Sequence, residues 1–267
     1  MSSEQSIFAA LRGGGRIWAV AAIHGDARRL VDLHRQIGSD FHPGDQIVYL
    51  GNYSGHGRAV RDCIDELLLF RRYLLARPGV DCRDIVFLRG AQEEMWQKLL
   101  QLQFAPNPVQ VLQWMVGQGI EPTIQAYGAT LDEALLAARD GTLSLTRWTG
   151  QLRQNMRNFD GHNALMSCLR HAAYTEDSVL LFVHAGIDPA RPLSAQSDSF
   201  WWGGAGFASL AQPYGGYARI VRGFDRRHGG LQETAFTVSL DAGCGFGGEL
   251  VAALFGPGGT IERTATA

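Results

Sequence analysis

The sequence predicts an α/β protein whose first sheet is mostly parallel, and three observations favour this class. Short apolar runs alternate with amphipathic helical stretches over the first 90 residues, and strand–helix–strand units join parallel strands through right-handed crossovers. The last third of the chain is rich in β-forming residues separated by glycine-containing turns. Hydrophobic residues make up 46% of the 267 residues, which is enough to bury a core and excludes a disordered chain.

Five elements are expected in the first 90 residues, in the order strand, helix, strand, helix, strand. The strands are short apolar runs bounded by turn residues, and the helices carry apolar residues on one face at a period near 3.6. Gly38 is a plausible end for the first helix, and Pro78 and Gly79 end the second unit. The five elements span residues 16–23, 27–37, 47–50, 58–75 and 84–88.

Polar and glycine-containing loops follow each of these three strands. They are "HGD" at 24–26, "GNYSGHG" at 51–57 and "RGAQEE" at 89–94. Because ligands bind at the carboxyl ends of the strands in parallel α/β sheets, we expect these three loops to line any site that the protein has.

The remainder of the chain divides into a helical part and a β-rich part. Residues 95–172 are expected to be mainly helical, and they predict an inserted helical cap at about residues 95–175. The segment "SVLLFVHAG" then predicts a further strand and loop, and "YARIVRG", "TAFTVSL" and "ELVAALFG" predict antiparallel strands or a second sheet. No repeat, low-complexity tract or linker is evident, so we expect a single domain over residues 1–267.

Charge and composition exclude several classes of partner. The formal net charge is -2 and the sequence has no block of Lys and Arg, which argues against nucleic acid or an anionic membrane as a partner. No run approaches the roughly 18 apolar residues of a membrane span, and the start lacks the features of a signal peptide. The four cysteines are far apart and have no zinc-ligand spacing. We therefore expect reduced thiols and a cytoplasmic protein.

Three further patterns have ordinary structural explanations. The segment "GCGFGG" at 243–248 lies between two expected strands without a following helix, so a tight turn is favoured over a dinucleotide-binding loop. No G-x-S-x-G nucleophile elbow occurs in the sequence. Trp201, Trp202 and Phe207 could form an aromatic patch for a partner, but core packing is the commoner use of such residues.

The loops after the strands also match a known family in their order. The segments are "AAIHG", "LGNYSGHG", "LRGAQEEM", "FVHAG" and "VRGFD". They resemble the calcineurin-like metallophosphoesterases, and more narrowly the bacterial Ser/Thr protein-phosphatase and symmetrical diadenosine-tetraphosphatase branch. The corresponding blocks of that branch are Gly-Asp-x-His-Gly, Gly-Asp-x-x-Asp-Arg-Gly, Gly-Asn-His-Glu, His-Ala-Gly and Gly-His. The resemblance covers about residues 16–255 and implies a four-layer α/β/β/α sandwich with a mainly helical inserted cap.

The resemblance implies a site for two divalent cations that share a bridging carboxylate and activate a water molecule for attack on phosphorus. Most of the implied ligands are replaced in this chain. The histidines of the first and fourth blocks are retained, and the bridging aspartate becomes an asparagine. Three other ligand positions carry side chains that cannot coordinate a metal. In chain order the six positions are Ala22, His24, Asn52, Ala91, His184 and Phe224.

The positions that the resemblance assigns to proton transfer and phosphate binding are replaced as well. The general-acid histidine of the third block falls on Gln92, and its supporting aspartate falls on Gly55. The arginine that clamps the phosphate falls on His56. Where relatives carry Trp-Ile-Arg, this chain has Gly203 in place of the arginine. We therefore expect no catalytic residues at these positions.

Electrostatics favours the loss of a binuclear centre. At an effective dielectric constant of about 20, two dications about 3.5 Å apart repel each other by roughly 20 kcal/mol before their ligands compensate. His24, Asn52 and His184 supply no carboxylate to offset that repulsion. The sequence therefore predicts a catalytically inactive pseudophosphatase without a cofactor, acting as a binding, regulatory or scaffold protein.

Two alternatives remain open at this stage. One is a phosphoesterase or other hydrolase with a single zinc or manganese ion at His24 and His184, helped by Asp26 or Asp225. In the other, the protein is a purely structural subunit whose pocket is closed. For Asp26 and Asp225, turn bonding or surface solvation is the simpler role.

The prediction of a binding protein does not specify the ligand. His56, together with Arg58 or Arg89 in the neighbouring loops, could accept an anion without a metal. A phosphate or nucleotide ligand is one candidate partner on this basis, and a protein is the other. An empty or sealed pocket is the competing interpretation.

Overall fold

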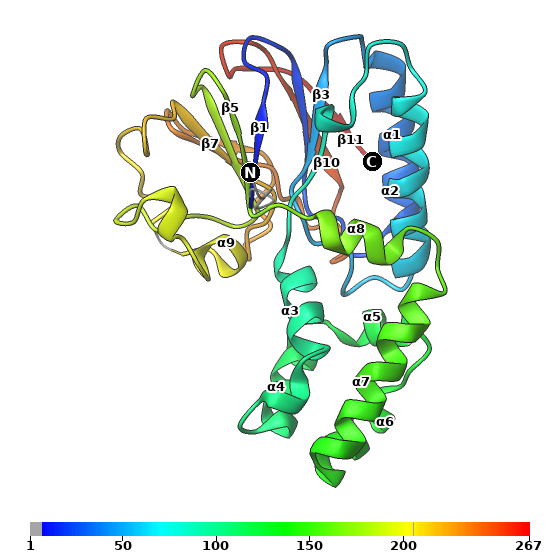
Figure 1. Cartoon of the computed structure of the whole chain (residues 1–267). Coiled ribbons are helices and arrows are strands. Elements are labelled where there is room, and N and C mark those ends of the chain that lie inside the picture. Colours follow the sequence, from blue (N-terminus) through cyan, green and yellow to red (C-terminus); the bar gives the residue numbers. More distant parts are fainter. Residues whose placement is uncertain (1–6, 205) are drawn as a thin grey trace, which may run out of the picture.

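The computed structural model describes residues 7–204 and 206–267. It contains two β-sheets packed face to face, with helices on the outside (Figure 1). The first sheet has five strands in the order β11-β10-β2-β3-β4, and the second has six strands in the order β1-β5-β6-β7-β9-β8. The predicted α/β/β/α class is confirmed.

The five-stranded sheet contains the strands that the first part of the sequence predicts. β2, β3 and β4 pair in parallel. The helix α1 connects β2 to β3, and α2 lies between β3 and β4. β10 and β11 extend the sheet in antiparallel fashion on the far side of β2. The bounds are β2 Ile17–Val20, α1 Ala27–Asp40, β3 Gln46–Tyr49, α2 Val60–Leu75, β4 Ile85–Phe87, β10 Val251–Phe255 and β11 Ile261–Thr266, with a 3₁₀ turn at Cys82–Asp84.

Both alternatives predicted for the last third of the chain occur: β7 and β9 belong to a second sheet, and β10 is an antiparallel strand. β6, β7 and β9 pair in parallel in the six-stranded sheet, whereas β10 pairs with β2 in the other sheet. The long connection between β6 and β7 allows the chain to return to the same end of the sheet, which parallel pairing requires. The bounds are β1 Phe8–Leu11, β5 Ala172–Thr175, β6 Leu180–Val183, β7 Arg219–Arg222, β8 Gln232–Glu233 and β9 Thr237–Ser239.

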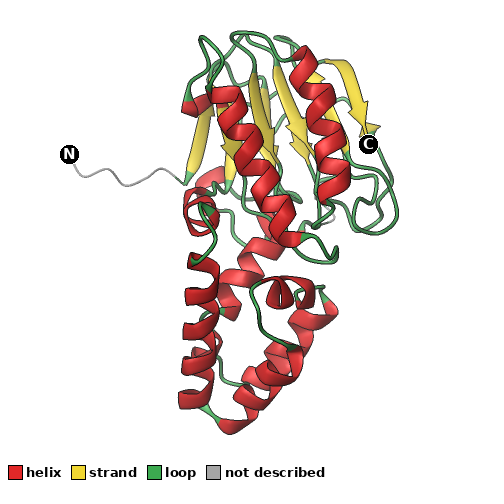
Figure 2. Cartoon of the chain, turned by 90° about the vertical axis from the view of Figure 1, so that its right-hand side faces the viewer, coloured by secondary structure: helices red, strands yellow, loops and turns green. Residues whose placement is uncertain are grey.

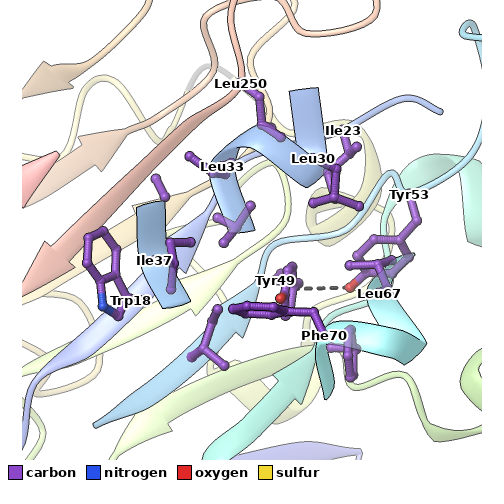
Figure 3. Close-up of a cluster of buried hydrophobic side chains, with 14 of the residues drawn as sticks. Trp18, Ile23, Leu30, Leu33, Ile37, Tyr49, Tyr53, Leu67, Phe70 and Leu250 are labelled. Carbon is purple, nitrogen blue, oxygen red and sulfur yellow. Dashed lines mark hydrogen bonds between the residues drawn. The ribbon is translucent and has the colours of Figure 1, made fainter. Parts of the chain in front are cut away.

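Four strands of the five-stranded sheet, β2, β3, β4 and β10, are buried on both faces, whereas the edge strand β11 is largely exposed. In β2 all four residues are buried, and successive side chains point to opposite sides. Trp18 faces the layer of α1 and α2, where it packs with Leu33 and Ile37 (Figure 3). Ala19 faces the second sheet, in a core that includes Phe182. This two-sided burial explains why the strands are continuous apolar runs rather than alternating ones.

The outer layer over the six-stranded sheet is thinner than the layer formed by α1 and α2. It consists of α9 (Ser199–Trp202), a 3₁₀ turn at Leu193–Ala195 and loops. Phe200, Trp201 and Phe207 are buried in it, against strands that include Ile220. Trp201 and Phe207 are therefore core residues, as the commoner use of such aromatic side chains suggests.

The segment between β4 and β5 is helical and projects away from the sandwich (Figure 2). Most of its helices enclose a core of their own, which includes Trp96, Leu112, Tyr127 and Leu152. α8 lies beside α2 instead, and its Leu165 belongs to the core of the sandwich. The bounds are α3 Ala91–Leu99, α4 Pro108–Gly117, α5 Glu121–Ala126, α6 Leu131–Asp140, α7 Thr142–Arg157 and α8 His162–Cys168, with a 3₁₀ turn at Leu102–Phe104. Among the residues that the structure describes, none of the helices has the length and apolar character needed to cross a membrane.

We predict that the contact between the sheets dominates stability. Phe182 is 0% exposed between them, whereas Phe104 is 80% exposed on the helical segment. Phe182→Ala should lower the free energy of unfolding by about 3–5 kcal/mol, because it removes buried apolar surface and leaves a cavity. Phe104→Ala should change it by less than about 0.5 kcal/mol. Chemical denaturation of both variants tests this, and equal losses would contradict the prediction.

Candidate functional site

The loops at the carboxyl ends of the strands line a pocket of about 210 Å³, which we call the site pocket. The loops after β2, β3 and β7, the turn before β10 and the end of α9 contribute to it, together with the start of α3 after β4 and the end of α4. Its lining residues are His24, Asn52, His56, Ala91, Gln92, Gly117, Gln118, Trp202, Phe224, Arg226, His228 and Phe246.

A buried carboxylate ties two of these loops together. Glu93, on the first turn of α3, is 2% exposed. Its oxygens accept hydrogen bonds from the backbone N–H groups of Asn52 (2.8 Å), Tyr53 (2.9 Å) and Gly90 (3.0 Å). The hydroxyl of Ser54 also donates to it, at 3.1 Å. Burial raises the pKa of Glu93, while the same hydrogen bonds oppose that rise by stabilising the carboxylate.

Glu93 was not among the site residues predicted from the sequence. The signal was present, because this residue stands where the third block of the resembling family ends in glutamate. Its role here is to hold the loop after β3 in place, and it does not line the site pocket.

The backbone at the site is held in an uncommon conformation. His24, Asn52 and His56 all have positive φ values, of 53°, 56° and 41°. Residues other than glycine rarely adopt this left-handed region, and they persist there when surrounding contacts fix them. The contacts are visible for Asn52: its N–H donates to Glu93, and its carbonyl accepts hydrogen bonds from Ile23 and His24.

His184 is a buried histidine, and one of its two ring nitrogens has no hydrogen-bond partner among the described residues. Its Nδ1 donates to the carbonyl oxygen of Leu50 at 2.6 Å, which fixes the proton on Nδ1. Its Nε2 is buried and has no hydrogen-bond partner within residues 7–204 and 206–267. Burial lowers the pKa of His184 to about 4, although the Leu50 carbonyl opposes the shift.

His24 is also neutral and almost fully buried. Asn52 Oδ1 accepts a hydrogen bond from the backbone N–H of Gln92 at 2.9 Å, which orients its amide nitrogen toward His24 Nε2 at 3.3 Å. His24 Nδ1 is left without a partner in the described part of the chain. Burial first, and then the positive charges that His56, His184 and His228 would carry, hold the pKa of His24 well below its usual value.

An aromatic ring stands beside both retained histidines. The Phe224 ring is stacked on the His184 ring, with centroids 5.4 Å apart and planes inclined by 5°. It also packs edge-on against His24 at 5.7 Å. Phe224 occupies the position that the resemblance assigns to the last metal-binding histidine, and it offers no ligand atom.

These side chains do not fit the binuclear metal centre that the resemblance implies. Asn52 uses both of its amide atoms within the protein, and Ala22 and Ala91 carry only methyl groups. Across the described residues, no group of three or more His, Cys, Asp or Glu side chains is arranged to hold a metal ion. No catalytic step is therefore derived through a metal pair.

A second aromatic cluster forms the rim of the pocket. Phe246, in the turn that the segment at 243–248 forms, lies 4.3 Å from the His56 ring and 4.4 Å from the His228 ring. His228 in turn forms a hydrogen bond to Asp241 at 2.9 Å. Neither Phe246 nor His228 was predicted to belong to the site. For Phe246 the reason is that the sequence of a glycine-rich turn does not indicate where its one large side chain lies.

The Gln92 side chain fills the space at the position that the resemblance assigns to the general acid. Gln92 Nε2 donates to the carbonyl oxygen of Gln118 at 2.7 Å. A Cβ atom added at Gly55 would lie 2.3 Å from Gln92, so no larger residue fits there unless Gln92 moves. Gln92 fills this corner of the site and joins it to the helical segment.

The two aspartates considered as compensating ligands have other partners. Asp26 caps α1 by accepting from the backbone N–H of Arg29 at 3.1 Å, and its side chain forms an ion pair with Arg29 at 3.3 Å. Asp225 forms an ion pair with Arg222. Neither lines the site pocket, and both make the turn and surface contacts expected as their simpler role.

The structure separates the residues considered for anion binding. His56 lines the site pocket, but Arg58 lines a different pocket of about 190 Å³ beside α5. Arg89 forms an ion pair with Glu94 at 3.2 Å and lies outside the site pocket. The arginine that does line the site pocket is Arg226, which the sequence analysis did not name.

Comparison with known proteins agrees with the fold. No protein-family model and no curated protein matches the sequence. A candidate diadenosine tetraphosphatase of known structure gives a TM-score of 0.54 at 22% identity, covering 97% of this chain and 97% of that chain. A protein serine/threonine phosphatase from Saccharomyces cerevisiae gives 0.53 at 14% identity, with 98% and 84% covered. A cold-active protein-tyrosine phosphatase of a psychrophilic Shewanella gives 0.51 at 14% identity, again with 98% and 84% covered.

These likenesses, together with the two-sheet topology, show that the chain has the fold of the calcineurin-like metallophosphoesterases, as its loop motifs predict. At this level of identity they show the fold alone. Activity and ligand have to be argued from the site.

We predict that the buried histidines make stability fall in acid. The folded-state pKa of His184, about 4, lies below the ordinary value of 6.5, so the unfolded chain binds the proton more readily. The stabilising contribution is therefore complete above pH 6.5 and is lost as the pH falls toward 4, by at most about 3 kcal/mol. Urea denaturation between pH 7.5 and 4 should show a shallower decline for His184→Gln, while the exposed-site control His42→Gln should follow the wild type. Identical slopes in all three proteins would contradict this.

We also predict that Glu93 is essential for the shape of the site. Glu93→Gln should lower the free energy of unfolding by about 3 kcal/mol, because an amide accepts fewer hydrogen bonds and turns its own donors toward backbone N–H groups. Glu176→Gln, at an exposed carboxylate, should change it by less than about 0.5 kcal/mol. Denaturant titration of both variants measures the difference, and a neutral Glu93→Gln would show that the carboxylate is dispensable.

Proposed function

We propose that this chain is a catalytically inactive protein on the metallophosphoesterase fold that acts by binding, as a regulatory or scaffold protein. The observation that carries the proposal is the Phe224 ring, which is stacked on His184 and packed edge-on against His24. It stands where the resembling enzymes have a metal-binding histidine. A hydrocarbon ring there removes one ligand and excludes water from the two histidines that remain.

Charge supports the same conclusion. In the resembling enzymes, carboxylates compensate two dications, but Asn52 is a neutral amide that is already bonded on both sides. The aspartates that lie closest in sequence to His24 and Phe224, Asp26 and Asp225, are paired with Arg29 and Arg222. An uncompensated pair of dications about 3.5 Å apart would face roughly 20 kcal/mol of repulsion at an effective dielectric constant of about 20.

The residue at the position assigned to the general acid, Gln92, cannot transfer a proton. Gln92 has no titratable group, and its side chain is held by the Gln118 carbonyl. A general acid must give up a proton near neutral pH, which an amide cannot do. The site therefore supports recognition rather than hydrolysis.

The proposal includes a phosphorylated small molecule, a phosphate or nucleotide, as the first ligand class to test, with a protein as the other. The printed names of the structural relatives, a diadenosine tetraphosphatase and a serine/threonine phosphatase, motivate that order. We further propose that the chain works as a single domain in the cytoplasm, since its four cysteines are free thiols.

A second candidate function is a hydrolase with one zinc or manganese ion. The observation that favours it is a pair of buried nitrogens, His24 Nδ1 and His184 Nε2, without partners among the described residues. Imidazole is a good ligand for these metals. Against it, both rings pack against Phe224, and two ligands are fewer than a catalytic zinc site ordinarily has.

Metal content per chain tests the proposal. Protein purified without an affinity tag or chelator should contain well under one metal ion per chain, and it should not hydrolyse p-nitrophenyl phosphate with added manganese. A variant with Ala22→Asp, Asn52→Asp, Ala91→Asn and Phe224→His restores the implied ligand set and should gain manganese binding, measured by elemental analysis after gel filtration.

The outcomes separate the candidates. Two tightly bound metal ions in the wild-type protein would sink the proposal outright. One ion that is lost in His184→Ala, together with phosphoesterase activity, would establish the mononuclear hydrolase instead. Circular dichroism of each variant checks that the fold is retained.

A further inference from the structure

A second pocket opens directly beside the site pocket. It has a volume of about 480 Å³, and we call it the arginine pocket. It shares Trp202, Phe224 and Arg226 with the site pocket, so the two form one continuous surface. Arg222, Asp225 and Arg227 line the rest of its polar surface, together with Gln232.

The charge of this surface is positive. The two pockets together are lined by three arginines, and Asp225 is the one carboxylate among their lining residues in the described chain. Asp225 is paired with Arg222, which also donates to Ser239 and lies over the Phe207 ring. Arg222 is thus a buried, compensated charge that supports the wall of the pocket.

Arg226 and Arg227 are different, because they are exposed and their charges are not compensated. Neither guanidinium forms a hydrogen bond or an ion pair with any residue in 7–204 or 206–267. They are consecutive in the loop after β7, and the backbone N–H of Arg227 donates to Asp225 at 3.3 Å. Arg226 lines both pockets and so lies at their junction, and Arg227 lies beside it in the arginine pocket.

We propose that the arginine pocket binds two linked phosphoryl groups of a pyrophosphate-bearing ligand, without a metal ion. Guanidinium groups match the geometry of phosphate oxygens through paired hydrogen bonds. Two adjacent arginines with no protein partner provide one such group for each phosphoryl. This inference rests on the proposed function and names the ligand class of the same region.

The shared aromatic wall indicates what accompanies the phosphates. Trp202 and Phe224 line both pockets, and Phe246 and His56 line the site pocket beyond them. Trp202 is supported from behind by Trp114, with ring centroids 5.2 Å apart. The base of a nucleoside diphosphate, joined to the second phosphoryl group through its ribose, would lie against this aromatic wall, whereas free pyrophosphate would use the arginines alone.

The same chemistry accounts for binding without hydrolysis. Bound divalent metals both attract phosphate and lower the pKa of water to create a nucleophile. A guanidinium also attracts phosphate, but it stays protonated and activates no water. The arginine pocket therefore keeps the electrostatic part of phosphate recognition and omits the catalytic part.

Calorimetric titration in the presence of EDTA tests the inference with four probes: inorganic phosphate, pyrophosphate, ADP and adenosine. Pyrophosphate and ADP should each bind with one molecule per chain, more tightly than phosphate or adenosine, and added salt should weaken both. In Arg226→Ala/Arg227→Ala their dissociation constants should rise at least tenfold. The matched control Arg28→Ala/Arg139→Ala removes the same net charge at exposed sites elsewhere and should bind like the wild type.

Each outcome decides the inference. If ADP binds more tightly than pyrophosphate, the ligand carries a ring; equal affinities support the inference with pyrophosphate alone as the recognised unit. If neither probe binds to the wild type at millimolar concentration, or if both bind unchanged to a double variant that melts like the wild type, the inference is overturned while the proposed function stands. Should the double variant melt early, Arg226→Lys, which keeps the charge but not the paired hydrogen bonds, must still weaken binding. Manganese-dependent hydrolysis of ADP by the wild type would instead overturn the proposed function.

Discussion

The site depends on one buried interaction, the carboxylate of Glu93 and the backbone N–H groups that it accepts from. These donors belong to Asn52, Tyr53 and Gly90, which lie in loops after two different strands. A buried carboxylate is costly unless it is hydrogen-bonded, and a loop of unpaired N–H groups is costly unless it meets an acceptor. Each therefore stabilises the other, and together they fix the loops around the site pocket.

Within that frame, an aromatic ring packs against both buried histidines. Phe224 lies against His24 and His184, and the Gln92 side chain covers Gly55. Neutral, buried histidines suit an apolar neighbour, since desolvation already lowers their pKa values. The replacements are thus mutually consistent: a restored carboxylate at one position would be buried against an aromatic ring at another.

The electrostatic character of the surface has changed in the same direction. A two-metal site combines negative side chains with positive ions, whereas here the side chains themselves are positive, at Arg226 and Arg227. Both arrangements attract phosphate, but only the first can activate water. The proposed binding function is therefore physically consistent with the side chains present at the site.

The order from β2 to β4 and the loops that line the pocket could be predicted from the amino-acid sequence, because periodicity, turn residues and crossover handedness are local properties. It did not reveal β1 or the parallel pairing of β6, β7 and β9, since strand partners distant in sequence leave no local pattern. Likewise, Arg58 and Arg226 look equally available in the sequence, and only the tertiary structure directs one to a separate pocket and the other to the site. The packing of the sheets and loops decides where such side chains lie. The fold could therefore be predicted from the sequence, but the arginine pocket could not.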